Sequence, residues 1–352
     1  MLQKFEGAIS ALPVPFHPDG RINWYELDRW VDYQLQNRIN GFVVGGTTGE
    51  SPTLHREQGM INKRVIKRVR SSGRDVPVIV GAGDYDTATA VQRTLEAFED
   101  GADATLHVMG YYNKPPQIGI RRRYFDPVSE AAHNLPIIMY NIQPRGAAEY
   151  KPSTMIELAK AHPNIIGVKE ASGATALDVA KTTRQHARDA GFDRHSFKIL
   201  SGDDDKTYAL MSDPEIEGVG VISVMSNLLP GEYQRFAEFV HDGKYNSQET
   251  LLVCLEPLNG MVGLTAFDDR IGEEDTFRNP IPVKAAAYLL GMISSPAVRP
   301  PLDELPEDGY QEVGRRLASA YLRTPDSFDT LGRFFRVDVG QRLKPYVEAI
   351  GR

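Results

Sequence analysis

The residues that could do chemistry gather in short polar stretches, each of which follows an apolar run. These stretches are GGTTGES at 45–51, GYYNKPP at 110–116, Tyr140 with Asn141, Lys169, and SGDDD at 201–205. Lys169 is the most unusual, because it ends the apolar run NIIGV, where the core pattern has just stopped. Two interpretations are open. The lysine forms a structural ion pair with Glu170 or an aspartate of 203–205, or it is a nucleophile that forms a Schiff base.

The position of Lys169 favours amine chemistry. An amine attacks a carbonyl carbon only when it is unprotonated, and burial among apolar groups disfavours the charged ammonium. Tyr140 is either a core aromatic or a phenol that moves protons near such an amine. Arg145 follows in the loop QPRGA, where it is either solvated or a bidentate ligand for an anionic substrate.

Two further stretches have competing interpretations. GGTTGES lacks the GKS/T ending of a P-loop, so it is a tight turn or a carboxylate site built from backbone N–H groups and the hydroxyls of Thr47 and Thr48. SGDDD could suggest a metal, but the histidines show no metal-ligand spacing, so we expect a helix start at 203–205 and no metal. The single cysteine, Cys254 in LLVCL, indicates a buried thiol.

The elements that must position these residues follow a regular rhythm. Eight apolar runs recur at intervals of roughly thirty residues, the size of a βα unit. They lie at 7–16, 41–46, 76–83, 104–110, 135–141, 165–170, 197–202 and 219–224. Helical periodicity fills the gaps, for example at 23–37, 87–101 and 151–164. The pattern predicts an α/β fold, a (β/α)8 TIM barrel, with a doubly wound open sheet as the alternative. In a barrel, the polar stretches would share the carboxyl-terminal rim of the strands.

The rhythm changes after the eighth run. We therefore expect a barrel core at 1–225, an appended C-terminal helical segment at 226–322 without intervening strands, and an extra tail of unknown role at 323–352. The acidic stretch 264–280 is expected to be an exposed loop.

Composition narrows the partners and the compartment. The 352 residues include 40 basic and 47 acidic side chains, a net charge of −7, which argues against nucleic acid and anionic membranes as partners. No apolar stretch reaches the roughly 18 residues of a membrane span, and the N-terminus lacks the pattern of a signal peptide. A cytoplasmic protein is the expectation.

Seven motifs in one order carry a family resemblance. They are GGTTGES, GYYNKPP, MYN with PRG, GVKEASG, SGDDD, GVISV and NPIPVKAAAYLLG. Together, over about residues 5–320, they resemble the dihydrodipicolinate synthase/N-acetylneuraminate lyase family, and most closely its synthase branch. The resemblance implies a (β/α)8 barrel and a class I (Schiff-base) lyase acting on pyruvate or another 2-oxo acid. It also implies a homotetramer and no metal or organic cofactor.

The resemblance assigns a role to each matching residue. Lys169 corresponds to the lysine that condenses with the 2-oxo carbonyl, and Tyr140 to the phenol that moves protons at the imine carbons. Thr47 corresponds to the hydroxyl that links this phenol to a second tyrosine, Tyr112, which reaches a neighbouring subunit's site. The substrate-binding residues that it implies are Thr48 for the pyruvate carboxylate, Arg145 for the carboxylate of the aldehyde, and Gly202 and Ile222 for the pocket lining.

These roles imply condensation of pyruvate with an aldehyde, with aspartate semialdehyde as the expected partner. The alternative is an aldolase or dehydratase for another 2-oxo acid, such as a 2-keto-3-deoxy sugar acid. A binding protein that had lost turnover is disfavoured because both Lys169 and Tyr140 are present. A metal-dependent aldolase is disfavoured by the missing histidine spacing.

Overall fold

The computed structural model describes residues 2–54, 56–243 and 255–351, so Cys254 and His55 lie outside the described residues. The chain divides into two compact units. Unit one comprises residues 1–9, 40–46 and 56–223, and unit two comprises residues 10–39, 47–55 and 224–352. The turn that follows the second strand therefore belongs to unit two, although the strand itself belongs to unit one.

Eight parallel strands close into a barrel in sequence order. The strands are β1 (Gly7–Ala11), β2 (Phe42–Val44), β3 (Val78–Gly81), β4 (Ala104–Val108), β5 (Ile137–Asn141), β6 (Ile165–Glu170), β7 (Lys198–Ser201) and β8 (Gly220–Ser223). The last strand meets the first where the Gly7 N–H donates to the Val219 carbonyl at 2.9 Å. All eight predicted strands are present, and closure confirms the barrel over the open sheet.

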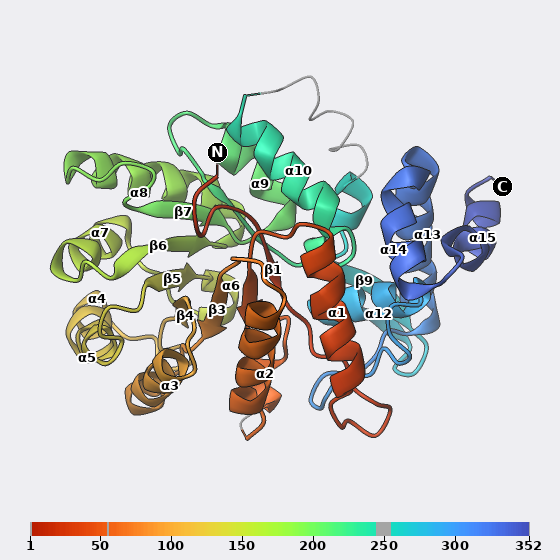
Figure 1. The fold of residues 1–352 in the computed structure, drawn as a ribbon, viewed down its shortest axis with the longest axis horizontal. Helices are drawn as coiled ribbons and strands as arrows, with labels where there is room; N and C mark the ends of the chain where they lie inside the picture. Colours follow the sequence, from red (N-terminus) through yellow and green to blue (C-terminus); the bar gives the residue numbers. More distant parts are fainter. Residues whose placement is uncertain (1, 55, 244–254, 352) are drawn as a thin grey trace. The chain divides into compact units, whose positions relative to one another are not determined.

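Helices follow the strands on the outside of the barrel (Figure 1). Those of unit one with at least six residues are α2 (Gln58–Ser71), α3 (Thr87–Glu99), α5 (Asp126–Ala131), α7 (Pro152–Ala161), α8 (Ala176–Asp189) and α9 (Thr207–Ser212). The N-terminus of α3 is capped by a side chain: the Asp86 carboxylate accepts from the Thr89 N–H at 2.8 Å. The predicted helices at 87–101 and 151–164 are confirmed, and SGDDD begins a helical turn at Asp204, as expected.

Unit two is mainly helical. Its helices are α1 (Trp24–Gln36), α10 (Pro230–His241), α12 (Ile281–Leu289), α13 (Glu307–Arg323), α14 (Asp329–Phe335) and α15 (Val339–Ile350). The buried face of α1 is anchored by side chains with a polar tip. The Trp30 indole N–H donates to the Asn227 carbonyl at 3.0 Å, and the Tyr33 hydroxyl donates to the Leu228 carbonyl at 2.8 Å. Among the described helices, none has the length and apolar character that a membrane crossing requires.

The expected loop at 264–280 is wrong. These residues form an antiparallel hairpin of β9 (Gly263–Asp268) and β10 (Glu273–Arg278). In β9 the buried residues alternate with exposed ones: Leu264 and Ala266 face inwards, while Thr265 and Phe267 face outwards. The charges of the turn and of β10 hid this alternation in the sequence.

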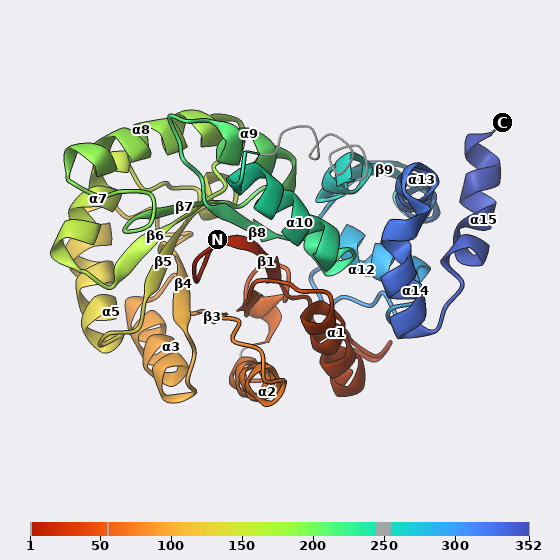
Figure 2. The same ribbon diagram turned by 45° about the horizontal axis from the view of Figure 1, so that its top comes forward.

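The tail is a folded part of unit two. Figure 2 shows α14 and α15 as separate helices at the blue end of the chain. The Phe334 and Phe335 rings lie 5.4 and 5.1 Å from the ring of Tyr33 in α1. The Arg342 guanidinium in α15 donates to the Leu289 carbonyl at the end of α12, at 2.6 Å. These contacts give residues beyond 323 defined positions against α1 and α12.

Candidate active site

Lys169 lies at the carboxyl end of β6, where the residue is only 5 % exposed. Tyr140 is paired with it in register on the neighbouring strand β5. The Lys169 Nζ atom lies 4.2 Å from the centroid of the Tyr140 ring. The barrel thus brings together the amine and the phenol that the sequence singled out, in a largely desolvated place.

A glycine makes room for this lysine. A Cβ atom on Gly202, just past β7, would lie 3.0 Å from the Lys169 Cε atom and 2.6 Å from the Ala171 Cβ atom. The Gly202 backbone N–H donates to the Glu170 carbonyl at 2.7 Å, which fixes the close approach. Any larger residue would therefore intrude on the lysine side chain.

The carboxylate next to Lys169 in sequence is not its partner. The Glu170 side chain accepts from the Asn141 amide at 2.9 Å and from the Ser172 N–H at 2.8 Å, which ties together the loops after β5 and β6. Neighbouring residues on a strand point to opposite faces, so Glu170 faces away from Lys169. Burial raises the pKa of Glu170, and the hydrogen bonds from Ser172 and Asn141 oppose that shift.

The aspartates of 203–205 do not pair with Lys169 either. Asp203 forms its ion pair with Lys206, at 3.7 Å. Burial raises the pKa of Asp203, and the charges of Lys206 and Lys169 oppose the shift. Within the described residues, no carboxylate forms an ion pair with Lys169. The geometry therefore disfavours a structural ion pair as the reason for this lysine.

The threonines of GGTTGES lie in the turn directly after β2, in unit two. The Glu50 N–H donates to the Thr47 carbonyl at 3.0 Å, which closes a four-residue turn. Thr48 is 2 % exposed, and its hydroxyl oxygen accepts from the Asn279 side-chain amide at 3.0 Å.

A buried ion pair holds the same turn. Glu50, in a left-handed backbone conformation, accepts from the Lys284 Nζ atom of α12 at 2.8 Å, and both side chains are fully buried. The Arg299 N–H donates to the second Glu50 oxygen at 2.8 Å. Burial lowers the pKa of Lys284, against the opposing effect of the Glu50 charge.

The remaining predicted residues are spread around unit one. Ile222 is buried in β8, and Arg145 is exposed in the short helix α6 (Gln143–Gly146) after β5. Tyr112 is 87 % exposed, so within one chain its side chain points to solvent instead of towards Lys169. A hollow of about 570 Å3 opens beside the ends of β5 and β6, between residues 143–149 and residues 172–175.

Sequence reasoning did not assign Glu50, Asn279 and Lys284 to the site. Asn279 and Lys284 stood inside a motif that was used only for the resemblance, and in GGTTGES only the backbone N–H groups and the threonines were given a role, not Glu50. The available signal was Lys284 itself, a charge inside the apolar helix IPVKAAAYLL, which must find a buried carboxylate.

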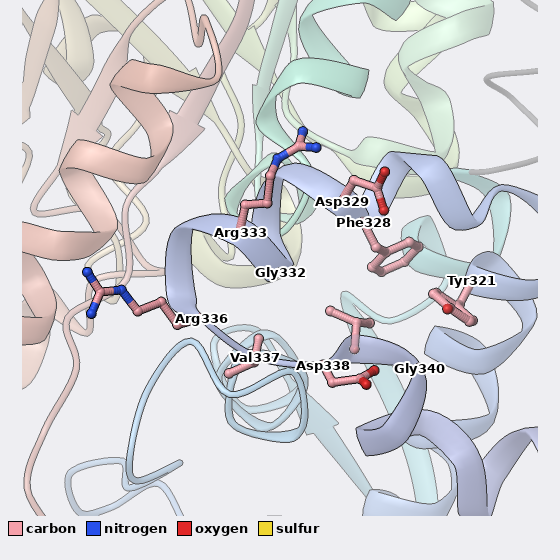
Figure 3. A pocket seen from close by; sticks show the side chains of 10 residues that line it. Tyr321, Phe328, Asp329, Gly332, Arg333, Arg336, Val337, Asp338 and Gly340 are labelled. Atoms are coloured by element: carbon pink, nitrogen blue, oxygen red, sulfur yellow. The ribbon is translucent and has the colours of Figure 1, made fainter.

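A second hollow, of about 530 Å3, lies in the tail region of unit two. Figure 3 shows the guanidinium groups of Arg333 and Arg336 pointing away from its centre. Asp338 caps α15 by accepting from the Gln341 N–H at 2.9 Å. The polar side chains that line this hollow therefore do not converge on a common point. Across the described ranges, no group of three or more His, Cys, Asp or Glu residues is arranged to hold a metal ion.

A closed barrel with a buried lysine beside a tyrosine at the strand ends defines the class of Schiff-base aldolases and lyases. Comparison with known proteins agrees with this class. Residues 4–320 match the model of the dihydrodipicolinate synthetase family. A 4-hydroxy-tetrahydrodipicolinate synthase from Methanopyrus kandleri is 38% identical over 316 residues, which is 89% of this chain and 96% of that protein.

Solved structures give the same answer. The 4-hydroxy-tetrahydrodipicolinate synthase of Methylacidiphilum fumariolicum superposes with a TM-score of 0.80 at 31% identity, covering 93% of this chain and 99% of that one. A dihydrodipicolinate synthase of Acinetobacter baumannii complexed with pyruvate has a TM-score of 0.77 at 30% identity, covering 90% and 99%. The chain belongs to the dihydrodipicolinate synthetase family, which confirms the resemblance drawn from the motifs.

Proposed function

We propose that this chain condenses pyruvate with aspartate semialdehyde through a Schiff base on Lys169. The single observation that carries the proposal is a buried lysine with no ion-pair partner among the described residues, 4.2 Å from a tyrosine ring. The Nζ atom attacks C2 of pyruvate, the carbonyl oxygen leaves as water, and an imine forms. Loss of a C3 proton gives an enamine, whose C3 attacks the aldehyde carbon; the aldehyde C=O becomes a hydroxyl as its oxygen takes up a proton. The amino group of the condensed aspartate semialdehyde then displaces the Lys169 Nζ atom from the imine carbon, which releases the product and regenerates the amine.

Each remaining site residue has a proposed part in this reaction. Tyr140 carries the protons that leave and enter near the imine, and Thr47 and Tyr112 complete its relay. Thr48 holds the pyruvate carboxylate with its N–H and hydroxyl groups, Arg145 binds the carboxylate of aspartate semialdehyde, and Gly202 and Ile222 line the pocket.

The choice of substrates rests on relatives. The protein from Methanopyrus kandleri carries the name of the synthase, and the structure from Acinetobacter baumannii holds pyruvate. An aldolase or dehydratase for a 2-keto-3-deoxy sugar acid is the alternative outcome of the test below.

Assembly and location are part of the proposal. Tyr112 would act across an interface, because its side chain is 87 % exposed in the single chain, and we propose a homotetramer. The enzyme would work in the cytoplasm with no metal or organic cofactor, since Schiff-base chemistry needs only the lysine amine and proton carriers.

The proposal is tested by Arg145→Ala assayed with two aldehydes. A charge-assisted contact to the carboxylate of aspartate semialdehyde is worth about 1.5–3 kcal/mol, so turnover of this aldehyde should fall about ten- to a hundredfold. Turnover of neutral glyceraldehyde, and borohydride trapping of pyruvate on Lys169, should be nearly unchanged.

Arg122→Ala is the matched control, because Arg122 is an exposed arginine on a surface helix (Ile120–Phe125). Equal losses on both aldehydes, or faster wild-type turnover of the neutral one, would support the sugar-acid aldolase instead. Failure of pyruvate to become trapped on Lys169 would remove the proposal altogether.

A further inference from the structure

The hydroxyl of Thr48 has a partner 231 residues further along the chain. The Asn279 side-chain amide donates to the Thr48 Oγ1 atom at 3.0 Å. Asn279 stands between the hairpin and α12, immediately after β10. The contact therefore joins the turn after β2 to a segment that lies outside the barrel strands.

Both ends of this contact are held in place. The Asn279 N–H donates to the Val262 carbonyl at 2.8 Å, and α12 begins two residues later. On the other side, the turn is fixed by Lys284 and by Arg299, whose guanidinium also donates to the Thr53 carbonyl at 3.2 Å. Neither partner can swing away without disturbing buried polar contacts.

A hydroxyl group carries one proton and two lone pairs. Because the Asn279 amide occupies a lone pair of Thr48 Oγ1, the Thr48 proton must point elsewhere. In the part of the chain that the structure describes, no protein group accepts it. Among the described residues the Thr48 backbone N–H donates to no protein group either, since the bond that closes the turn runs from the Glu50 N–H to the Thr47 carbonyl. Two donors on one 2 % exposed residue are thus left for an acceptor-only ligand.

We infer that Asn279 is a positioning residue that makes Thr48 a committed donor, and that it thereby selects substrates with a carboxylate beside the 2-oxo group. This inference rests on the proposed function. A carboxylate accepts hydrogen bonds and cannot donate one, so a hydroxyl whose proton is free to donate while Asn279 occupies one of its lone pairs suits a carboxylate better than it suits an alcohol or an amide.

The first test measures the pyruvate concentration that half-saturates borohydride trapping on Lys169. Thr48→Val should raise it by about ten- to a hundredfold, and Asn279→Ala by about three- to tenfold, with the trapping rate at saturation little changed. The double variant should lie within about twofold of Thr48→Val alone, because Asn279 acts through the hydroxyl that Thr48→Val removes.

Asn164→Ala is the matched control. Its amide also contacts a hydroxyl-bearing residue, since the Ser129 hydroxyl donates to it at 2.6 Å, but it lies before β6, at the other end of the strand from Lys169. It should leave the half-saturating concentration unchanged. Additive losses for Thr48→Val and Asn279→Ala would show that Asn279 acts independently of Thr48, and would overturn the inference.

Asn279→Asp distinguishes the direction of the hydrogen bond. A carboxylate at 279 would accept the Thr48 proton and repel the substrate carboxylate, so half-saturation should rise at least about tenfold. Wild-type affinity in this variant would mean that Thr48 donates to position 279, contrary to the inference. If the wild-type chain traps no pyruvate at all, the proposed function fails; if it traps pyruvate and these variants do not change half-saturation, only the role of Asn279 fails.

Discussion

Each of the two units buries a lysine, and the two lysines differ in the side chain that they contact. Lys284 in unit two is fully buried and meets the equally buried Glu50 at 2.8 Å. Lys169 in unit one is 5 % exposed and faces the Tyr140 ring, while the nearby Glu170 is turned to Asn141 and Ser172. Burial lowers the pKa of Lys284 although the Glu50 charge opposes that shift, whereas Lys169 meets an aromatic ring and, among the described residues, no ion-pairing carboxylate.

The comparison indicates that the same type of side chain serves structure at Lys284 and chemistry at Lys169. The Glu50–Lys284 pair anchors the turn that carries Thr48, and the Lys284 amine is engaged by the Glu50 carboxylate instead of being open to a carbonyl group. The strand end of β6 holds an amine without such a partner. Substitutions of Lys169, Lys284 and Glu50 test whether one lysine serves the reaction and the other the stability of the fold.

The largest expected effect is the loss of imine formation in Lys169→Ala. Removing the nucleophile should lower pyruvate trapping and turnover by at least about a thousandfold, since no other group supplies the covalent step. The measurement is borohydride reduction with pyruvate, followed by mass analysis of the peptide that bears residue 169. Lys284→Met is the comparison, and it should still be labelled at Lys169. A label on Lys284 in the wild-type chain would reverse the assignment.

The next effect is on stability. Lys284→Met leaves the Glu50 carboxylate buried without its ion-pair partner, so the free energy of unfolding should fall by about 3–5 kcal/mol. The double variant Glu50→Gln with Lys284→Met should lose less than the sum of the two single variants. Chemical denaturation monitored by circular dichroism measures both.

Lys344→Met is the control for this pair, because Lys344 and Glu348 lie 3.9 Å apart and are 61% and 54% exposed. Its effect should stay below about 1 kcal/mol. An equally small loss for Lys284→Met would show that the buried pair does not anchor the turn.

The smallest expected effect concerns His107, another buried base of unit one, whose ring contacts hydroxyl and aromatic groups among the described residues. Its ring lies 3.1 Å from the Thr105 hydroxyl, and burial lowers its pKa to about 3. The unfolded chain takes up a proton near pH 6.5 and the folded chain does not, so stability from this group is present above that pH and is lost as pH falls towards 3. Between pH 6.5 and 5 the loss is about 1.6 kcal/mol.

His107→Gln should remove that part of the pH dependence. The difference in the free energy of unfolding between pH 6.5 and 5 should shrink by about 1.6 kcal/mol relative to the wild type. His186→Gln, on the exposed face of α8, should leave the difference unchanged. An unchanged slope in His107→Gln would indicate that the buried ring is charged in the folded chain.

The sequence by itself determined the barrel and the reactive strand end. Each strand is a contiguous apolar run, and each outer helix repeats apolar residues at helical spacing. Both patterns can therefore be recognised within about fifteen residues. Parallel strands in a barrel place their carboxyl ends on one rim, and that rule was enough to bring Lys169 beside Tyr140. The hairpin at 263–278 was not predicted because buried and exposed residues alternate in β9 only. In β10 nearly all residues are exposed and most are charged.

Only the tertiary structure decided which polar and charged side chains pair with one another. Glu50 meets Lys284 across 234 residues, and Asn279 meets Thr48 across 231, through packing that no local pattern records. The same holds for the tail, whose Phe334 and Phe335 reach Tyr33 of α1. Hydrogen bonds and ion pairs depend on where side chains end in space. A sequence can show that a buried lysine exists, but the fold determines whether a carboxylate stands beside it.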